Sequence, residues 1–212
     1  MVTEMYQPQV PITSAAEVKA ILGPDIPNQV SKVINHIDAH TRAWIERCPF
    51  IVISSINAAG FMDSSPKGDP PGFVKILDEH TLTIPDRIGN HRADTFFNVL
   101  ENPSVGIVFI MPKRREVVRV SGMASLARDP DLLAKMAIDG KLPQLALVVR
   151  VKEAFFHCGK AMIRSGMWEP DRWGPVDGLP TYAQALKDHG AMPDALEDLQ
   201  ARVERNETHR LY

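Results

Sequence analysis

Between residues 50 and 157 the sequence breaks into short apolar segments separated by turns, and this pattern constrains the fold more than any other feature. Six or seven of the segments have the length and residue types of strands. Most of the connections are too short for anything but antiparallel neighbours. Closing such a set into a small barrel would remove the edges that it otherwise exposes. We expect strands over 50–57, 60–65, 73–77, 81–84, 105–111, 116–127 and 145–156.

Helices are expected around these strands. Ser14 and Glu17 have the form of a capping box, which predicts a short helix that ends at Gly23. Apolar residues at helical spacing predict one long helix over 28–47. The stretch 66–72 is rich in proline and glycine and is predicted to be a loop. Shorter helices are expected over 91–100, 129–138, 160–167, 181–189 and 194–205.

Charge and hydropathy exclude several classes of protein. The 212 residues include 24 basic and 26 acidic side chains, so the chain as a whole does not match nucleic acid and any anion site must be local. No apolar run approaches the ~20 residues of a membrane span. Residues 1–11 lack the pattern of a secretion signal. We therefore expect a cytoplasmic protein that binds neither nucleic acid nor a membrane.

The chain is expected to form one structural domain with three parts. These are a helical segment over 1–48 that packs on the barrel, the barrel core over 49–165, and a loop with surface helices over 166–212. Cys48 and Cys158 are expected to be free thiols, with one long-range disulfide as the alternative.

The segment 84–92 carries the most informative local signal. A strand ends there, a loop follows, and a helix is expected to start at Asn90, with Arg87 and Arg92 on either side. Free N–H groups and the positive end of a helix favour an anion. Two guanidinium groups add the geometry that suits phosphate. The alternative is an ordinary Asn-capped helix with solvated arginines.

Three other features of the sequence are candidate sites. Arg119 lies between two valines on a strand and so points to the opposite face, where it is either solvated or a contact for a ligand or partner. His157 and Cys158 could bind a metal, or Cys158 could act as a nucleophile. A metal site needs more ligands than these two residues, and an inert buried thiol is commoner than a catalytic one. His36 and His40 could share a metal on the long helix, or be half-exposed and solvated. No metal site is predicted, and no catalytic residue is assigned.

Taken together, the middle of the chain resembles the pyridoxamine 5′-phosphate oxidase-like superfamily of FMN-binding split barrels. The resemblance covers roughly residues 45–170 and is closer to a bacterial subgroup than to the oxidase itself. It implies an α+β, mainly β fold: a six- to seven-stranded antiparallel split barrel with flanking N- and C-terminal helices. It also implies a homodimer with FMN at the subunit interface. The matching pieces, in order, are 65–75, 82–92, 98–106, 118–122 and 157–168.

The resemblance also implies cofactor contacts around the phosphate. Asn90 and Arg92 take the place of a Ser-x-Lys that holds the FMN phosphate in the superfamily. Arg87 is implied as a further phosphate or ribityl contact. Ile84 and Pro85 match the strand that passes the ribityl chain.

Further contacts are implied around the flavin ring. Phe73, Val74 and Lys75 match the stretch that lines the ring in one subunit. From the second subunit the implied contacts are Arg119, His157, Cys158 and Lys160.

The end of the sequence departs from the oxidase. Arg210-Leu211-Tyr212 keeps only the Arg-Leu of the oxidase's closing Arg-Leu-x-Pro, so pyridoxal chemistry is not implied. We expect an FMN-dependent oxidoreductase that acts on an unidentified small molecule. One alternative is a flavin- or haem-binding module with little turnover, in which His157 or Cys158 would be the axial haem ligand. Another is a cysteine-based redox protein centred on Cys158.

Overall fold

The computed structural model describes residues 5–212 and divides the chain into two compact units, one ending at Val33 and the other running from Ile34 to Tyr212. The first unit contains α1 (Ala15–Leu22) and α2 (Pro27–Ser31). The short helix and its Ser14 cap are confirmed, because the Ser14 Oγ accepts a hydrogen bond from the Glu17 N–H at 3.2 Å, while the Glu17 carboxylate accepts from the Ser14 hydroxyl at 2.7 Å. The predicted boundaries at 48 and 165 stay predictions.

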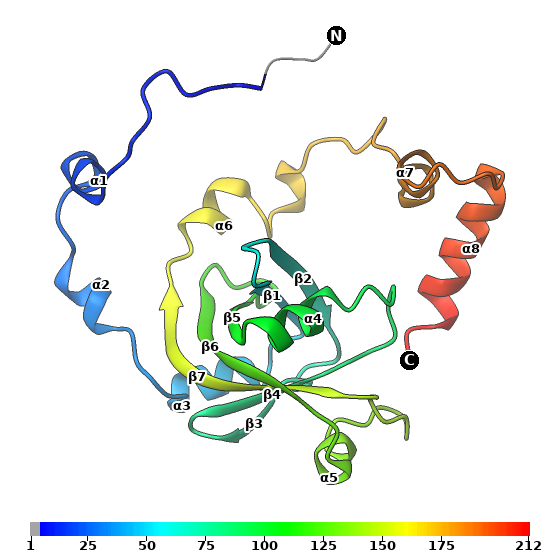
Figure 1. Cartoon of the computed structure of the whole chain (residues 1–212), viewed down its shortest axis with the longest axis horizontal. Helices are drawn as coiled ribbons and strands as arrows, with labels where there is room; N and C mark the ends of the chain where they lie inside the picture. Colours follow the sequence, from blue (N-terminus) through cyan, green and yellow to red (C-terminus); the bar gives the residue numbers. More distant parts are fainter. Residues whose placement is uncertain (1–4) are drawn as a thin grey trace. The chain divides into compact units, whose positions relative to one another are not determined.

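A seven-stranded sheet, entirely antiparallel, dominates the second unit (Figure 1). Its hydrogen-bonded order is β2-β1-β5-β6-β7-β4-β3. The strands lie within a few residues of their predicted places. The sheet does not close, since β2 and β3 each have one neighbour, so it is the split barrel that the resemblance implies and not a closed one. The strands are β1 (Phe50–Ile56), β2 (Met62–Gly68), β3 (Lys75–Asp78), β4 (Thr81–Pro85), β5 (Ser104–Phe109), β6 (Val117–Ala127) and β7 (Ala146–His157).

Alternation along the strands builds the core. In β5, every second side chain from Val105 to Phe109 is buried, and β1 buries Ile51 and Ile53 in the same way. Successive side chains of a strand point to opposite faces, so the buried face of the curled sheet is mostly apolar, with Ser55 and Thr83 as buried polar exceptions. The completely or almost completely buried side chains include Ile45, Ile51, Ile53, Leu82, Ile107, Phe109, Val118, Val120 and Val149.

Part of the predicted loop over 66–72 is strand instead. Pro66 pairs with Val52, and Lys67 pairs with Ile51, so β2 continues to Gly68. A proline lacks the N–H that a central strand must donate, but β2 is an edge strand and has a neighbour on one side only. The prediction was wrong because the sequence does not show which strand is an edge.

The predicted long helix over 28–47 is also wrong. After α2, the main chain of Ile34 exchanges hydrogen bonds with that of Ala154 on β7, at 3.0 and 2.7 Å. A new helix, α3 (Ala39–Ile45), then begins behind Asp38, whose carboxylate accepts from the Thr41 N–H at 2.8 Å. An aspartate at this position favours a helix start over a helix interior. His36 and His40 therefore do not lie on one helix.

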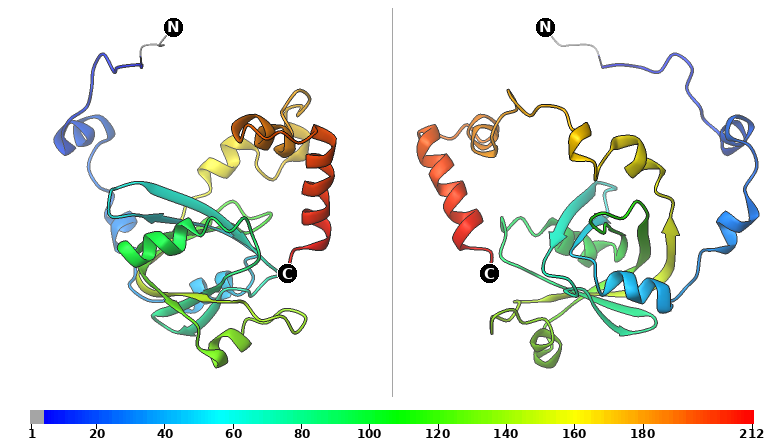
Figure 2. Two further views of the ribbon diagram at one scale, coloured as in Figure 1. Left: turned by 45° about the vertical axis from the view of Figure 1, so that its right-hand side comes forward. Right: turned by 180° about the vertical axis from the view of Figure 1, so that it is seen from behind.

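The remaining helices of the second unit lie between strands or after them. They are α4 (Asp94–Glu101), α5 (Pro130–Ala134), α6 (Lys160–Ser165), α7 (Tyr182–His189) and α8 (Leu196–His209), with a 3₁₀ turn over Pro170–Arg172. The helices α7 and α8 pack on each other and bury Ala183 and Leu199 completely. Figure 2 shows α8 standing apart from the sheet, with its C-terminal end nearest to the sheet. No helix within residues 5–212 is both long and apolar enough to cross a bilayer.

Candidate functional site

A cavity of about 450 Å³ lies where β4 ends. Its walls are the segment 86–91, the loop 141–145, Lys67 from the edge strand β2, and Tyr212. This volume falls within the roughly 300–1,000 Å³ of small-molecule sites. A second cavity of about 180 Å³ lies between β2 and the start of α4 and adjoins the first. The two share the side chains of Lys67, Asn90, Ala93 and Phe96.

The helix α4 is fixed on the sheet by two polar contacts. Buried Asn98 donates its amide to the Ser55 hydroxyl on β1 at 2.9 Å, and the Thr95 hydroxyl donates to Asp63 on β2 at the same distance. Because these contacts join the first two turns of α4 to two strands, the start of the helix is held in place beside the cavities.

The predicted helix start at Asn90 is wrong, since α4 begins at Asp94. His91 and Ala93 have φ angles of 59° and 57°, a left-handed backbone that no α-helix contains. The Asn90 carboxamide instead accepts from the Arg92 N–H at 3.0 Å and closes a turn before the helix. Ala93 has no side chain that could cap the first N–H groups of α4. The helix therefore begins uncapped at the wall of the smaller cavity.

Two cationic side chains lie near the start of α4, at the wall of the smaller cavity. Lys67 lies with its ammonium 5.5 Å from the centre of the Phe96 ring, and Arg92 is exposed. The Arg92 Nε donates to Asp94 at 2.6 Å, and this hydrogen bond and the carboxylate charge raise the pKa of Arg92. Asp63 also lines the cavity. An anion bound here would therefore compete with Asp94 for the Arg92 guanidinium.

Arg87 has different surroundings. Its Nε donates to Asp69 at 2.6 Å, and a terminal nitrogen donates to the Met136 carbonyl at 2.8 Å. The Arg87 side chain is 17% exposed and that of Asp69 only 2%. Arg87 thus borders the larger cavity while two of its five N–H donors are used within the protein. Its predicted contact with the cofactor stays a prediction.

Asp86 is a wall residue that the sequence analysis missed. Its N–H donates to the Leu145 carbonyl at 2.9 Å, and its half-buried carboxyl faces the cavity. Burial raises the pKa of Asp86, although Lys67, Arg87 and His91 act in the opposite direction. Lys67 was missed as a site residue too, because 66–72 was interpreted as a loop. The alternation of exposed and half-buried residues in β2 would have placed Lys67 on the face of Asp63 and Ser65.

Several predicted flavin contacts lie in the core. Phe73, Val74, Ile84 and Pro85 are buried, and none of them lines either cavity. Lys75 donates its ammonium to the Gly72 carbonyl at 2.7 Å. A contact between these residues and FMN would have to come from their main chain or from a rearranged side chain. Their predicted role in binding FMN stays a prediction.

The four contacts predicted for the second subunit do not line the cavities. Arg119 is exposed and points away from the buried Val118 and Val120, as the alternation predicts, and lies 5.1 Å from the Phe155 ring. The other three, His157, Cys158 and Lys160, are exposed where β7 meets α6.

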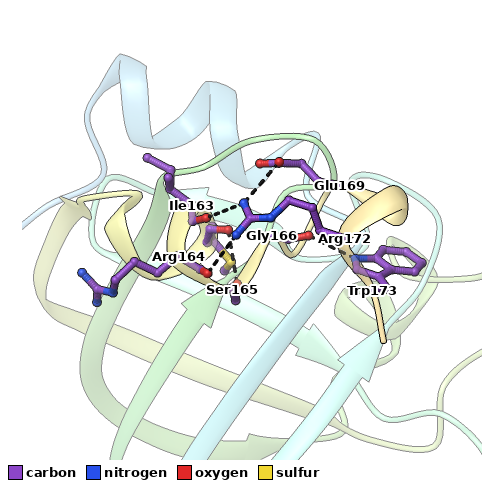
Figure 3. Close-up of polar contacts among 8 residues, drawn as sticks. Ile163, Arg164, Ser165, Gly166, Glu169, Arg172 and Trp173 are labelled. Atoms are coloured by element: carbon purple, nitrogen blue, oxygen red, sulfur yellow. Dashed lines mark hydrogen bonds and ion pairs between the residues drawn. The ribbon is translucent and has the colours of Figure 1, made fainter. Parts of the chain in front are cut away.

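The turn after α6 is held by Arg172 (Figure 3). Its guanidinium donates to the carbonyls of Ile163 and Arg164 at 3.2 and 3.4 Å, and to Glu169 at 3.2 Å. The Trp173 indole donates to the Gly166 carbonyl at 3.0 Å. These bonds satisfy the carbonyls that the end of a helix leaves free. The guanidinium of Arg164 points away from this cluster.

Cysteines and metal ligands add no further centre in residues 5–212. Both cysteines are free, and Cys48 is buried with its thiol directed at the Phe50 carbonyl at 3.1 Å. Burial raises the pKa of the Cys48 thiol. No three His, Cys, Asp or Glu side chains among the described residues are grouped so that they could hold a metal ion.

Comparison with known proteins gives one family match and several distant structural ones. Residues 37–158, more than half of the chain, match the family model of pyridoxamine 5′-phosphate oxidase. No curated protein matches the sequence.

Three crystal structures that the fold resembles are remote in sequence. HupZ of Group A Streptococcus is 16% identical over 57% of this chain and 93% of its own, with a TM-score of 0.46. HutZ, the heme storage protein of Vibrio cholerae, is 13% identical over 57% and 94%, with a TM-score of 0.42. An FMN-binding protein of Syntrophomonas wolfei is 10% identical over 66% and 95%, with a TM-score of 0.41. At these values the matches say nothing about the ligand of this chain.

Proposed function

The chain belongs to the pyridoxamine 5′-phosphate oxidase family, and on that premise we propose that it binds FMN and uses it as an oxidoreductase on a small molecule. The observation that carries the proposal is the pair of adjoining cavities at the uncapped start of α4. Asn90, Arg92 and Lys67 meet there, each with polar atoms suited to a phosphate.

The residues present fit a mononucleotide. The smaller cavity offers the Arg92 guanidinium, the Lys67 ammonium and the first N–H groups of α4 to a phosphate. The larger cavity has room for a small organic group beside it. Its lining is mixed, with Leu142 and Ile88 as apolar surface and Asp86 as a polar group. Such a lining offers apolar surface for a ring together with polar groups that could orient it.

FMN when bound supplies hydride or single-electron transfer, and the protein supplies binding and surroundings. Arg92 and Lys67 would hold the phosphate, and the left-handed main chain of His91 and Ala93 would keep the N–H groups of this turn in place. The exposed Arg119 and Lys160 would bring positive charge to the ring from a partner subunit, favouring negative charge on it.

We propose further that the protein is a homodimer. Apolar side chains stand exposed on the hairpin between β1 and β2 and on the neighbouring α4, where the Ala58 N–H donates to Glu101 at 3.0 Å. Large exposed apolar groups that gather on one side are a usual mark of an interface. They are Phe61, Met62, Phe97 and Leu100, with exposed fractions of 74, 70, 59 and 71%.

The test of cofactor identity compares FMN with riboflavin, which has the same ring but no phosphate. We expect the purified protein to show a flavin absorption spectrum or to take up added FMN. We expect riboflavin to bind at least about tenfold more weakly, because it cannot make the charge-assisted bonds. Equal affinity would remove the phosphate site from the proposal. A Soret band in the purified protein, lost on replacing His157 and Cys158, would favour haem instead.

Sedimentation tests the dimer. Wild type is expected to sediment as a dimer, and the double variant Phe97→Asp, Leu100→Asp as a monomer that has lost FMN affinity. A wild-type monomer with one tightly bound FMN would contradict a cofactor site at the interface.

A further inference from the structure

A third cavity, of about 220 Å³, lies at the other end of β4 from the candidate cofactor site. The strand β4 begins at Thr81, directly after His80 of this cavity's wall, and ends at Pro85, next to the wall of the larger cavity. No described residue lines both this cavity and either of the other two. It is therefore a separate place in the fold. Its walls are Asn35, His80, Arg150, Val151 and Lys152.

Hydrogen bonds to main-chain carbonyls hold the walls of the third cavity together. The Val151 N–H on β7 donates to the His80 carbonyl at 2.8 Å. The His80 Nδ1 in turn donates to the Asn35 carbonyl at 3.1 Å, since a carbonyl can only accept. Two residues along the chain from Asn35, the Ile37 N–H donates to the Glu79 carbonyl at 2.7 Å. The cavity is thus formed before any ligand enters, and little further ordering is needed to fill it.

The strand β7 is irregular where it borders this cavity. Its pairing register with β6 shifts between Ser121 and Gly122, which leaves Lys152 as an extra residue in a β-bulge. Gly122 makes the bulge possible, because a Cβ there would overlap the Arg150 carbonyl oxygen. Bulges are frequent beside functional sites, where they redirect a side chain. Here the bulged residue is one of the two cations of the cavity wall.

The charge of the cavity wall is positive and uncompensated. Within residues 5–212, neither Arg150 nor Lys152 forms an ion pair with a carboxylate. None of the described residues that line the cavity is acidic. Asp78, in the same turn as His80, already accepts from the His80 N–H at 2.7 Å. Two cations beside one small hollow repel each other, and an anion between them would remove that repulsion.

We propose that this third cavity binds a phosphate dianion, either free or as the end group of a small organic phosphate ester. Arg150 offers a fork of N–H donors that suits phosphate oxygens, and Lys152 adds a second positive charge. A phosphate monoester carries about 1.5–2 negative charges at neutral pH, which two cations balance and a single carboxylate does not reach. The cavity is smaller than the roughly 300 Å³ at which sites for whole organic ligands begin, so it fits a group of this size.

Amide chemical shifts of the full chain test the site by nuclear magnetic resonance. Inorganic phosphate is titrated at constant ionic strength, with and without added FMN. We expect the amides of Asn35, His80 and Val151 to shift together and to saturate, while chloride leaves them unchanged. The amides of 88–94 report the candidate cofactor site separately. A protein that takes up no FMN would contradict the proposed function and leave this measurement intact.

A pair of double variants assigns the binding to the two cations. Arg150→Gln with Lys152→Gln is expected to raise the Kd for phosphate at least about tenfold, because both charge-assisted contacts are lost. Both side chains are exposed, so folding should be retained, and urea denaturation checks it. The matched control is Arg128→Gln with Lys135→Gln, which removes the same charge from exposed positions outside the cavity. This control should bind phosphate as wild type does.

A titration with methyl phosphate distinguishes the two forms of the ligand. A Kd equal to that of inorganic phosphate would show that the site accepts an ester, and binding of inorganic phosphate alone would identify the free ion as the ligand. Shifts that rise without saturation, or that both double variants lose equally, would show that Arg150 and Lys152 are solvated surface cations. Either of these last two results would overturn the site.

Discussion

Arg87 and Arg92 border the same short segment after β4, yet their surroundings are opposite. Arg87 turns inward to Asp69 and the Met136 carbonyl and is mostly buried. Arg92 turns outward, with Asp94 as its carboxylate partner and most of its side chain in solvent. The difference teaches that a guanidinium near a cavity can serve the fold or the ligand. The hydrogen bonds that the guanidinium already makes within the protein indicate which of these two roles it has.

The largest expected effect comes from removing the inner arginine. Arg87→Met keeps the bulk of the side chain but leaves the 2%-exposed Asp69 carboxylate without a cation. Breaking a buried pair on one side costs about 3 kcal/mol or more of unfolding free energy. Urea denaturation of the variant and of wild type measures this loss of unfolding free energy. The double variant with Asp69→Asn should recover part of the loss, and a variant as stable as wild type would contradict the comparison.

The next effect concerns the outer pair. Asn90→Ala with Arg92→Ala is expected to weaken FMN binding about tenfold or more, because a charge-assisted phosphate bond and the turn that presents it are both lost. Stability should change little, since both side chains are exposed. Fluorescence titration gives the Kd, and urea denaturation serves as the control. An unchanged affinity for FMN would show that Arg92 is a solvated surface residue and not a ligand contact.

A smaller effect, of opposite sign, tests the competition at Arg92. Asp94→Asn removes the carboxylate that holds the Arg92 Nε and is expected to tighten FMN binding about two- to fivefold at low salt. Because Arg92 is largely exposed and Asp94 is partly exposed, the gain should shrink at about 1 M salt. Titrations at the two salt concentrations measure it. Weaker binding in the variant would show that Asp94 positions Arg92 more than it competes for it.

The smallest effect is a pH dependence at Asp86. Burial raises the pKa of Asp86, so the folded chain holds this proton more tightly than the unfolded one. The contribution of Asp86 to stability is present below the ordinary pKa of a carboxyl and is lost as pH rises through the raised value. Asp86→Asn should therefore be slightly more stable than wild type at pH 7, with the advantage gone at about pH 3.5. Thermal melts at both pH values decide it, and an advantage that grows toward low pH would contradict the assignment.

The strands could be predicted because their signal is local. Alternation and β-branched residues identify β1, β5 and β6 from a few neighbouring positions. The break between α2 and α3 could not be predicted, because it depends on a β-bridge between Ile34 and Ala154, which lie 120 positions apart in the sequence. Pro66 and Lys67 were assigned to a loop for the same reason, because being an edge strand is a property of the whole sheet.

The sequence indicated the segment that the cavities border, but not how the side chains of that segment are used within the fold. The segment 84–92 was singled out from a strand end, a glycine and two arginines, and the structure places cavities there. That Arg87 would be used by Asp69, and that Tyr212 would lie beside it, needed the tertiary structure. No pattern in the sequence joins residues so far apart.

The proline in the edge strand β2 has a consequence for how the protein behaves at high concentration. An open sheet edge is a template on which a second chain can add a strand, and repetition of that step leads to fibrils. Pro66 removes one donor from this edge, and Lys67 beside it places a charge there. The same two residues that line the smaller cavity would thus also protect the chain from aggregation.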